Sequence, residues 1–273
     1  MLETDPYPHF VKDDALPEDE RQMLLEEWPD SEYFSDEIPG NTVYWMQSVP
    51  APQHWRTFLP ERLEELARQA IRLFAPWIIS RLGPEIGPVT QIASLMEAKP
   101  EYVGIQPHHH HYHSPNWIAT VLVYLDDTPG DFEGTVVNRL HGNAVEVFLE
   151  TCLWGEMACF SEHLIVDYAP RRMFAFADGP LSYHSSHKAT GPRGKRRTLR
   201  FHLSTPWEIC ERIYGVTERD YVAAHPIRET ATDPRVAQWA ERDVVLMRNP
   251  VHISAEEAAI WAKKIEIIPL LAE

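Results

Sequence analysis

The sequence contains no hydrophobic run of the roughly 18 residues that a membrane-spanning helix requires. Its N-terminus also lacks the pattern of a secretory signal, in which basic residues precede an apolar stretch and a small-residue cleavage site. Apolar residues make up 44% of the chain, which is ordinary for a globular protein. These features predict a chain that folds in water, and we expect a cytoplasmic location.

Basic residues are scarce, because 25 lysines and arginines stand against 41 acidic residues and the net charge is −16. Nucleic acids and anionic membrane surfaces attract proteins through basic patches. The charge therefore argues against both as partners. The sequence does not fix the oligomeric state, and a homodimer is one expectation.

Cysteine is also rare. Cys152, Cys159 and Cys210 make an odd count, and their spacing is not that of metal ligands. We therefore expect free thiols in a reducing compartment, and neither a disulfide framework nor a cysteine-based zinc site.

What the sequence does contain is a long central segment whose hydrophobicity alternates with period two, as in β-strands. Residues 60–80 before this segment repeat apolar side chains at helical spacing from Leu63 to Phe74, and Pro60 suits the first position of that helix. The pattern predicts an α+β protein with a mainly β core: a double-stranded β-helix (jelly roll, cupin-like) flanked by N- and C-terminal helices. The strand-like runs are 89–98, 101–106, 117–127, 134–140, 144–150, 158–162, 172–179 and 196–204.

The chain is predicted to form one compact domain in three parts. Residues 1–58 are rich in proline, acidic and aromatic residues and are predicted to form an irregular or helical arm. Residues 59–205 form the β-helix core. Residues 206–273 form a C-terminal helical extension, with helices expected over 233–247 and 254–265.

Five histidines fall within six residues immediately before a predicted strand, in QPHHHHYHSPNWIATVLVYL. Residues i and i+2 of an extended segment point to the same side, so His111 and His113 can face one ion. A third ligand from a distant strand end would complete a set that leaves positions open for reactants, and His184 and His187 are the candidates. An exposed histidine run can also bind metal adventitiously, so the cluster alone leaves a metal site and a chance run open.

Two arginines, Arg196 and Arg197, begin the last run of the core. By alternation Arg197 shares a face with Leu199, Phe201 and Leu203, and that face is apolar. A charge at the end of an inward apolar stripe needs an anionic partner, and a guanidinium can grip a carboxylate through two parallel hydrogen bonds. The pattern predicts a carboxylate-binding role for Arg197, against the alternative of a surface basic loop.

Taken together, these pieces resemble the Fe(II)- and 2-oxoglutarate-dependent oxygenase superfamily, which includes the prolyl 4-hydroxylases. The resemblance covers about residues 60–205 and rests on four pieces in the family's order. HYHSPNWIATVLVYLDD resembles the metal-binding stretch, and FEGTVV resembles the Gly-Thr hairpin through Gly134 and Thr135. RMFAFADGPLSYHSSH is similar to the segment that delivers the distal histidine, and RRTLRFHL to the cosubstrate strand.

The resemblance implies a metal centre with one unusual member. Its first ligand would be His111 and its distal ligand His184 or His187, with His184 preferred because the loop insertion GPRGK is easily tolerated. His113 stands where the family carries an acidic ligand. Three outcomes stay open: a three-histidine iron site, a site that His113 supports without binding the metal, and a protein that has lost the activity.

The resemblance also implies a reaction. Fe(II), 2-oxoglutarate and O2 would serve to hydroxylate, or otherwise oxidise, a small-molecule substrate, and Arg197 or Arg196 would bind the cosubstrate together with Tyr124. Two alternatives stand beside it. A three-histidine dioxygenase would bind its substrate directly and need no 2-oxoglutarate, and an inactive jelly-roll protein would serve as a binding module.

Overall fold

The computed structural model describes residues 1–30, 35–38, 41–45, 55–82, 89–98, 104–110, 117–127, 134–141, 146–148, 153–155, 159–179, 181–187, 196–205, 207–214 and 263–265. Its helices are α1 (Glu18–Glu26), α2 (Trp55–Leu82) and α3 (Trp207–Tyr214). Its strands are β1 (His9–Lys12), β2 (Ser35–Ile38), β3 (Asn41–Trp45), β4 (Val89–Ala98), β5 (Ile105–His109), β6 (Trp117–Tyr124), β7 (Thr135–Leu140), β8 (Glu146–Phe148), β9 (Leu153–Gly155), β10 (Phe160–Val166), β11 (Met173–Ala177), β12 (His184–Ser186), β13 (Arg196–Ser204) and β14 (Lys263–Ile265). No helix in these ranges combines the length and apolar character needed to cross a membrane.

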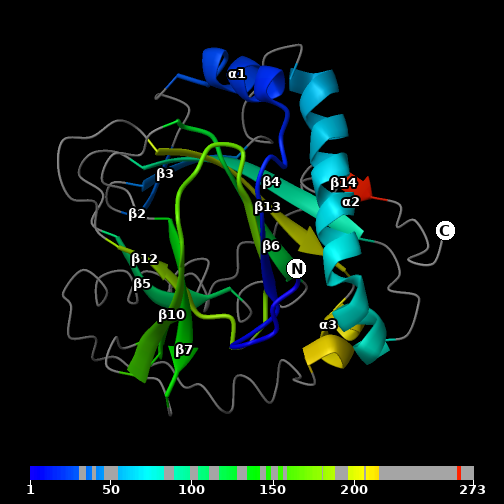
Figure 1. The fold of residues 1–273 in the computed structure, drawn as a ribbon, viewed down its shortest axis with the longest axis vertical. Helices are drawn as coiled ribbons and strands as arrows, with labels where there is room; N and C mark the ends of the chain where they lie inside the picture. The colour runs from blue at the N-terminus through cyan, green and yellow to red at the C-terminus, as the bar shows by residue number, and fades with distance from the viewer. Residues whose placement is uncertain are drawn as a thin grey trace, which may run out of the picture.

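The strands form two antiparallel sheets (Figure 1). Sheet A has the order β1-β11-β6-β13-β4-β3-β2, with β14 paired to β4, and sheet B has the order β10-β7-β12-β5-β9-β8. Four core strands lie in each sheet: β4, β6, β11 and β13 in sheet A, and β5, β7, β10 and β12 in sheet B. Along the chain they alternate between the sheets except at β7 and β10, which follow one another in sheet B. Two interleaved four-stranded sheets of this kind make a double-stranded β-helix, or jelly roll, so the predicted fold class is confirmed.

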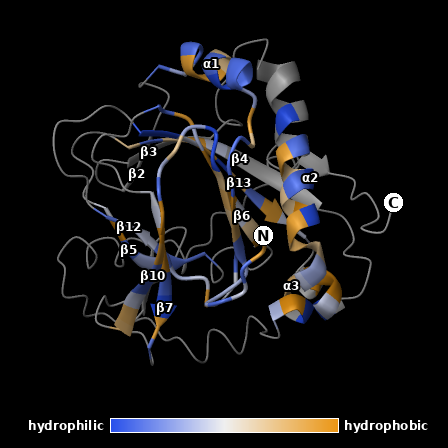
Figure 2. Cartoon of the chain, viewed as in Figure 1, coloured by the Kyte–Doolittle hydropathy of each residue, from blue (hydrophilic) through white to orange (hydrophobic). Residues whose placement is uncertain are grey.

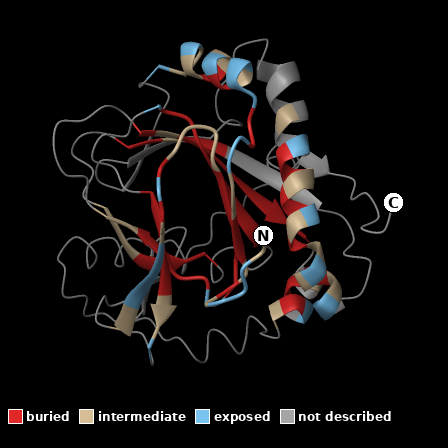
Figure 3. Ribbon diagram, in the orientation of Figure 1, coloured by how far each residue is buried: buried red, intermediate tan, exposed pale blue. Residues whose placement is uncertain are grey.

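Helix α2 runs along sheet A (Figure 1), and its buried side chains share one hydrophobic core with residues of β13. Along the helix, hydrophobic and hydrophilic positions alternate (Figure 2), and so do buried and exposed ones (Figure 3). This confirms the predicted apolar stripe at each position whose side chain is described. The buried helix residues are Leu66, Ala67, Ala70, Ile71, Phe74 and Ile78.

Helix α2 begins earlier than predicted, at Trp55, so Pro60 lies in its second turn and not at its first position. Proline has a backbone φ that suits a helix, so the residues before it extend the helix at the cost of one backbone hydrogen bond.

A second core lies between the sheets. Strands β6 and β11 are buried along their whole length, because helix α2 covers one face of sheet A and sheet B covers the other. This inner core is rich in aromatic side chains, and the guanidinium of Arg196 lies over two of them, Tyr124 and Tyr168. Its buried members are Tyr7, Leu122, Tyr124, Val137, Val166, Tyr168, Phe174 and Phe176.

The predicted strands agree best with the structure at the two ends of the core. Runs 89–98 and 196–204 coincide with β4 and β13, and run 117–127 contains β6. Strand β5 begins four residues later than the predicted run 101–106, so it ends among the histidines. Strands β9 and β12 are absent from the prediction, because three residues are too few to show a period.

Both ends of the chain depart from the prediction. The N-terminal arm contributes β1, β2 and β3 to sheet A besides helix α1. Residues 263–265, predicted to be helical, form β14 and pair with residues 89–91 of β4. Of the described residues of β4, strand β3 pairs with 94–98 only, so the backbone groups of 89–91 are available to another extended segment. The rest of both predicted C-terminal helices lies outside the described residues, as does Cys152. Cys210 is buried and Cys159 is partly buried.

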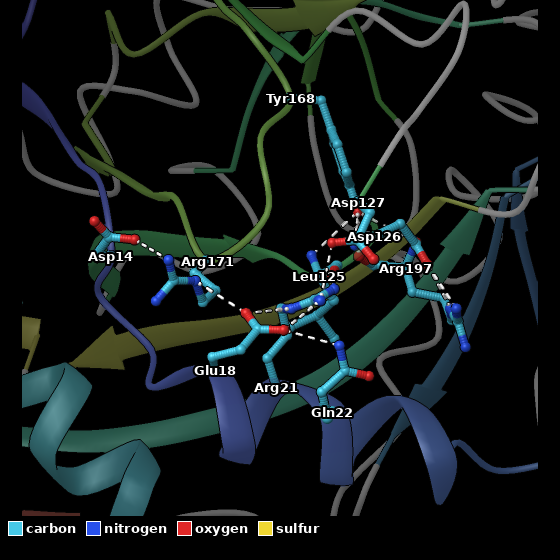
Figure 4. Close-up of polar contacts among 10 residues, drawn as sticks. All are labelled: Asp14, Glu18, Arg21, Gln22, Leu125, Asp126, Asp127, Tyr168, Arg171 and Arg197. Carbon is cyan, nitrogen blue, oxygen red and sulfur yellow. Dashed lines mark hydrogen bonds and ion pairs between the residues drawn. The ribbon is translucent and has the colours of Figure 1, made fainter.

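Helix α1 is attached to the core by Arg21, whose side chain is only 2% exposed. The Arg21 guanidinium donates to the Leu125 carbonyl at the end of β6 (2.6 Å) and pairs with Glu18 (2.6 Å) and Asp127 (2.9 Å), as Figure 4 shows. A buried charge with this many partners is satisfied. The acidic arm is therefore packed against the end of β6 at this point and is not simply a solvated segment.

Candidate metal centre

Three buried histidines meet where β5 and β12 pair. His108 lies in β5, His110 follows the end of that strand, and His184 begins β12 opposite His108. Ring nitrogens of the three residues lie within 4.8 Å of one another. The sequence predicts His111 and His113 as a ligand pair at positions i and i+2. The pair that the structure brings together is His108 and His110, which have the same spacing three residues earlier.

Each of the three rings is oriented through Nδ1. His108 and His184 donate to the backbone carbonyl two residues earlier, at 2.9 and 3.0 Å, and His110 Nδ1 lies 3.1 Å from a carboxylate oxygen of Asp178. Carbonyl and carboxylate oxygens only accept hydrogen bonds, so Nδ1 carries the proton and Nε2 carries the lone pair. This is the tautomer in which an imidazole binds a metal through Nε2.

Burial keeps His108 and His184 uncharged. It lowers the pKa of His108 from 6.5 to about 3 and the pKa of His184 well below its ordinary value, and the neighbouring histidines add to both shifts. At neutral pH these rings are therefore already in the deprotonated form that a metal requires.

A group of buried polar side chains lies behind His110. Asp178 accepts hydrogen bonds from His110 Nδ1 and from the Thr120 hydroxyl, which in turn accepts one from His202 Nδ1 at 2.9 Å. His202 stacks on Trp117 with ring centroids 3.5 Å apart, and its Nε2 has no hydrogen-bond partner among the described residues. Ligand atoms of His110, Asp178 and His202 also lie within 4.8 Å of one another. The Thr120 hydroxyl joins them, which indicates a hydrogen-bond network and not a second metal site.

The predicted histidines have different locations. His184 belongs to the cluster, whereas the side chain of His187 is one-third exposed and its Nε2 pairs with Glu162. His111 and His113 lie outside the described residues. The geometry thus favours His184 over His187 as the distal ligand.

The two adjacent arginines point to opposite faces of sheet A. Arg197 pairs with Asp126 at 2.6 Å, and its backbone N–H donates to the same carboxylate (Figure 4). The anionic partner that the sequence predicts for Arg197 is therefore a residue of the protein itself. Arg196 faces the inner core, where its guanidinium lies over the rings of Tyr124 (5.6 Å) and Tyr168 (5.2 Å), and no carboxylate of the described residues pairs with it.

Tyr124 is held by the predicted Gly-Thr hairpin. The hydroxyls of Tyr124 and Thr135 are 2.8 Å apart. A Cβ atom at Gly134 would lie 1.6 Å from the carbonyl oxygen of Val166, so only glycine lets the start of β7 approach β10 this closely. The glycine sets the position of the strand, and the threonine then fixes the tyrosine that lies beneath Arg196.

Sequence reasoning misses His108 and His110 as ligands, although both belong to the histidine run that it singles out. It also misses Asp178, Thr120 and His202 as residues of the site. A signal for His202 exists, because alternation along RRTLRFHLS places it on the same face as Arg196. Asp178 and Thr120 carry no such signal. An aspartate after an apolar strand is typical of a turn, and a threonine within a strand is ordinary.

The donor set fits a divalent transition metal, because imidazole is a common ligand of iron, copper and zinc. A metal about 2.1 Å from each nitrogen would hold the three nitrogens roughly 3–3.5 Å apart. The rings of His108, His110 and His184 are close enough to reach that spacing by small side-chain adjustments. Among the described residues, no carboxylate joins this group of three, and Asp178 contacts His110 from its Nδ1 side.

No protein-family model and no curated protein matches the chain. Among solved structures, it is similar to a prolyl hydroxylase from Trichoplax adhaerens in complex with a peptide of the hypoxia inducible factor oxygen degradation domain, with 13% identity over 72% of this chain and 83% of that one and a TM-score of 0.49. It is similar to a prolyl-4-hydroxylase from Pseudomonas putida, with 14% identity over 72% and 91% and a TM-score of 0.42. A third structure is an oxidoreductase of the 2-oxoglutarate–Fe(II) oxygenase family from Burkholderia pseudomallei, with 11% identity over 72% and 84% and a TM-score of 0.45.

At these identities the comparisons do not assign an activity to this chain. The structural neighbours of the chain are Fe(II)- and 2-oxoglutarate-dependent oxygenases, the family that its sequence resembles, and its jelly roll contains a buried histidine cluster with the donors for a metal.

Proposed function

We propose that this chain is a non-haem Fe(II) oxygenase that uses 2-oxoglutarate and O2 to hydroxylate, or otherwise oxidise, a small molecule. One observation carries the proposal: the imidazoles of His108, His110 and His184 are buried together, each with its Nδ1 proton engaged. Iron held by these residues would supply the activation of oxygen. The protein's own part is to bind the reactants, orient them and keep water out.

In this proposal the metal ligands are His108, His110 and His184. Three protein ligands leave other positions on the metal for reactants, as in the two-histidine, one-carboxylate iron sites. Three neutral imidazoles give the centre one negative charge less than such a site. Iron held here should therefore be harder to oxidise than in sites with a carboxylate ligand.

Arg196 is the proposed anchor for the distal carboxylate of 2-oxoglutarate. It is 9% exposed, and a buried guanidinium calls for an anionic partner, which a dicarboxylic acid can supply through two parallel hydrogen bonds. Tyr124 beneath Arg196 and Thr120 beside His110 are four residues apart on β6, roughly 13 Å at about 3.3 Å per residue. An arginine side chain and a five-carbon diacid together can span that separation.

We infer a small-molecule substrate from the net charge of −16, which disfavours a nucleic-acid or anionic-membrane partner. A cytoplasmic location and a homodimer stay predictions from the sequence.

A second candidate function is supported by the ligand group itself, which within the described part of the chain consists of three histidines and no carboxylate. A three-histidine dioxygenase would bind its substrate directly at the metal and would need no 2-oxoglutarate. Arg196 would then hold a carboxylate of the substrate.

The experiment that tests the proposal is an anaerobic titration of the apo-protein with Fe(II) and then with 2-oxoglutarate, followed by optical absorption. We expect a weak visible charge-transfer band that appears only when both are present. Stoichiometric iron without this band would support the second candidate. No stoichiometric metal would mean that the fold serves as a binding protein.

A further inference from the structure

The three histidines of the candidate centre are not held by the same kind of partner. His108 and His184 donate from Nδ1 to neutral backbone carbonyls, whereas His110 faces the carboxylate of Asp178 at 3.1 Å. A hydrogen bond from an imidazole to a carboxylate is stronger than one to a carbonyl, and it makes the opposite ring nitrogen a better donor to a metal. The His110 ring is therefore set apart from the other two.

Asp178 is placed by a closed turn between β11 and β12. Its backbone N–H donates to the Ile118 carbonyl (3.1 Å), the Gly179 N–H donates to the Ser182 hydroxyl (2.9 Å), and the Ser182 N–H donates back to the Gly179 carbonyl (3.0 Å). The same turn supplies the Ser182 carbonyl that orients His184. One short turn thus orients two of the three candidate ligands.

The Asp178 carboxylate is fully buried and sits within a directed chain of hydrogen bonds. The His202 ring donates to the Thr120 hydroxyl, the hydroxyl donates to Asp178, and His110 donates to Asp178 from the other side. A buried carboxylate is costly unless positive charge lies near it. A cation held by the three histidines would lie one imidazole away from this carboxylate and would compensate its charge.

We propose that Asp178 supplies, through the His110 ring, the negative charge that the three-histidine ligand set lacks. The inference rests on the metal site of the proposed function. Asp178 is a positioning residue: it fixes the orientation and the tautomer of His110, and the metal in turn is bound more tightly. Where the related family has an acidic ligand, this chain has an acid one ring farther from the metal.

The test is the affinity of the full-length apo-protein for Zn(II), measured by competition with a chromophoric chelator. Asp178→Asn keeps an acceptor of the same size at Nδ1 but removes the charge, and we expect roughly 10- to 100-fold weaker binding. Glu162→Gln is the matched control, because it makes the same change in the surface carboxylate–histidine pair with His187, and its affinity should equal that of the parent. Equal affinities of Asp178→Asn and the parent would overturn the inference.

A second measurement needs no variant at Asp178 and so does not depend on how that variant folds. Long-range proton–nitrogen NMR spectra of the Zn(II)-loaded parent should place the Nδ1 proton of His110 well downfield of those of His108 and His184, since its hydrogen bond is charge-assisted. Equal positions for the three protons would overturn the inference. Thr120→Val, which removes the hydroxyl that donates to Asp178, should move the His110 proton, whereas a purely structural role would leave it in place.

The two proposals fail in distinguishable ways. A parent protein that binds no Zn(II) would overturn the metal site and this inference together. Zn(II) binding that depends on Asp178 would support the inference even if 2-oxoglutarate produced no charge-transfer band with iron. The third outcome is a charge-transfer band with iron and 2-oxoglutarate, together with equal Zn(II) affinities for the parent and Asp178→Asn. It would overturn the inference about Asp178 and leave the proposed function standing.

Discussion

The two faces of strand β13 differ in character although the strand is almost wholly buried. On the face toward helix α2, Leu199, Phe201 and Leu203 are fully buried in the larger hydrophobic core. The face toward sheet B is polar at every position. Its residues are Arg196, Thr198, Arg200, His202 and Ser204, each 9% exposed or less.

A polar side chain is costly to bury unless it is hydrogen-bonded, so the inner face needs an explanation that the outer face does not. Within the described residues, His202 Nε2 and Ser204 Oγ have no hydrogen-bond partner and Arg196 has no carboxylate partner. On the outer face the one charged residue, Arg197, is paired with Asp126. We infer from this difference that the outer face serves stability, and the proposed function would assign binding to the inner face. Substitutions at alternate residues of one strand should then have separable effects.

The largest effect is expected on the inner side, from His184→Ala. Loss of a hydrogen bond to a ligand typically costs 10–100-fold in metal affinity, so loss of the ligand itself should cost more than about 100-fold. Calorimetric titration of the apo-protein with Zn(II) measures the change. His187→Ala removes a histidine three positions away that pairs with Glu162 at the surface, and it should bind metal like the parent. Equal losses of Zn(II) affinity in the two variants would show that the inner face does not hold the metal through His184.

The outer face should respond in stability instead. Phe201 is fully buried between sheet A and helix α2, and Phe201→Ala should lower the free energy of unfolding by about 3–5 kcal/mol. Thr198→Ala on the inner face should cost only about 1 kcal/mol. Urea denaturation measures both, and Zn(II) stoichiometry should stay unchanged in each. A folded Phe201→Ala protein without metal would show that the two faces are not separable.

The two arginines offer a sharper version of the same contrast. Arg196→Gln should weaken 2-oxoglutarate binding to the Fe(II)-loaded protein by roughly 10- to 100-fold, the equivalent of about 1.5–3 kcal/mol for a hydrogen bond to a charged group. Arg197→Gln should leave that affinity unchanged but lower the free energy of unfolding by about 1–3 kcal/mol, because it removes the guanidinium that pairs with the Asp126 carboxylate. Anaerobic titration with 2-oxoglutarate gives the affinities. The opposite result would return the anchor to Arg197, as the sequence alone predicts.

The sequence predicts the two faces of β13 but not their roles. Alternation in RRTLRFHLS separates Arg196 and His202 from Leu199 and Phe201. It does not reveal which face meets the ligand, because helices cover one side of sheet A and a second sheet covers the other. An apolar stripe is equally compatible with either side.

The sequence also predicts the kind of histidine pair at the site but not which histidines form it. It predicts His111 and His113 as a pair at i and i+2, whereas the structure brings together His108 and His110. Which histidines take these positions depends on the register of β5. That register is set by pairing with β12, which places His184 opposite His108. Asp178 is harder still, since its contact with His110 exists only after β11 and the β5 end have come together. Local patterns thus predict the elements and the kind of site, and long-range pairing selects its members.

The smallest effect is expected from mild acid, and it too should separate the two faces. Burial lowers the pKa of His108 and of His202 to about 3, and that of His184 well below 6.5, whereas unfolded histidines titrate near 6.5. As pH falls, the unfolded chain binds more protons at these histidines than the folded chain does. The free energy of unfolding is therefore highest above about pH 6.5 and falls progressively toward pH 3. Between pH 7 and 6 each buried histidine should cost the apo-protein less than about 1 kcal/mol.

Urea midpoints of the apo-protein at pH 7, 6 and 5.5 measure how steeply the free energy of unfolding falls with pH. His202→Gln removes one buried imidazole from the inner face. The loss of unfolding free energy between pH 7 and 5.5 should then be smaller by about the contribution of one histidine. Phe201→Ala, on the outer face, should lower the free energy of unfolding equally at all three pH values. His187→Gln changes a partly exposed histidine and should match the parent. A parent whose stability is the same at pH 7 and 5.5 would mean that the inner histidines are hydrated, and the inner face would then not be the dry binding surface inferred from its burial.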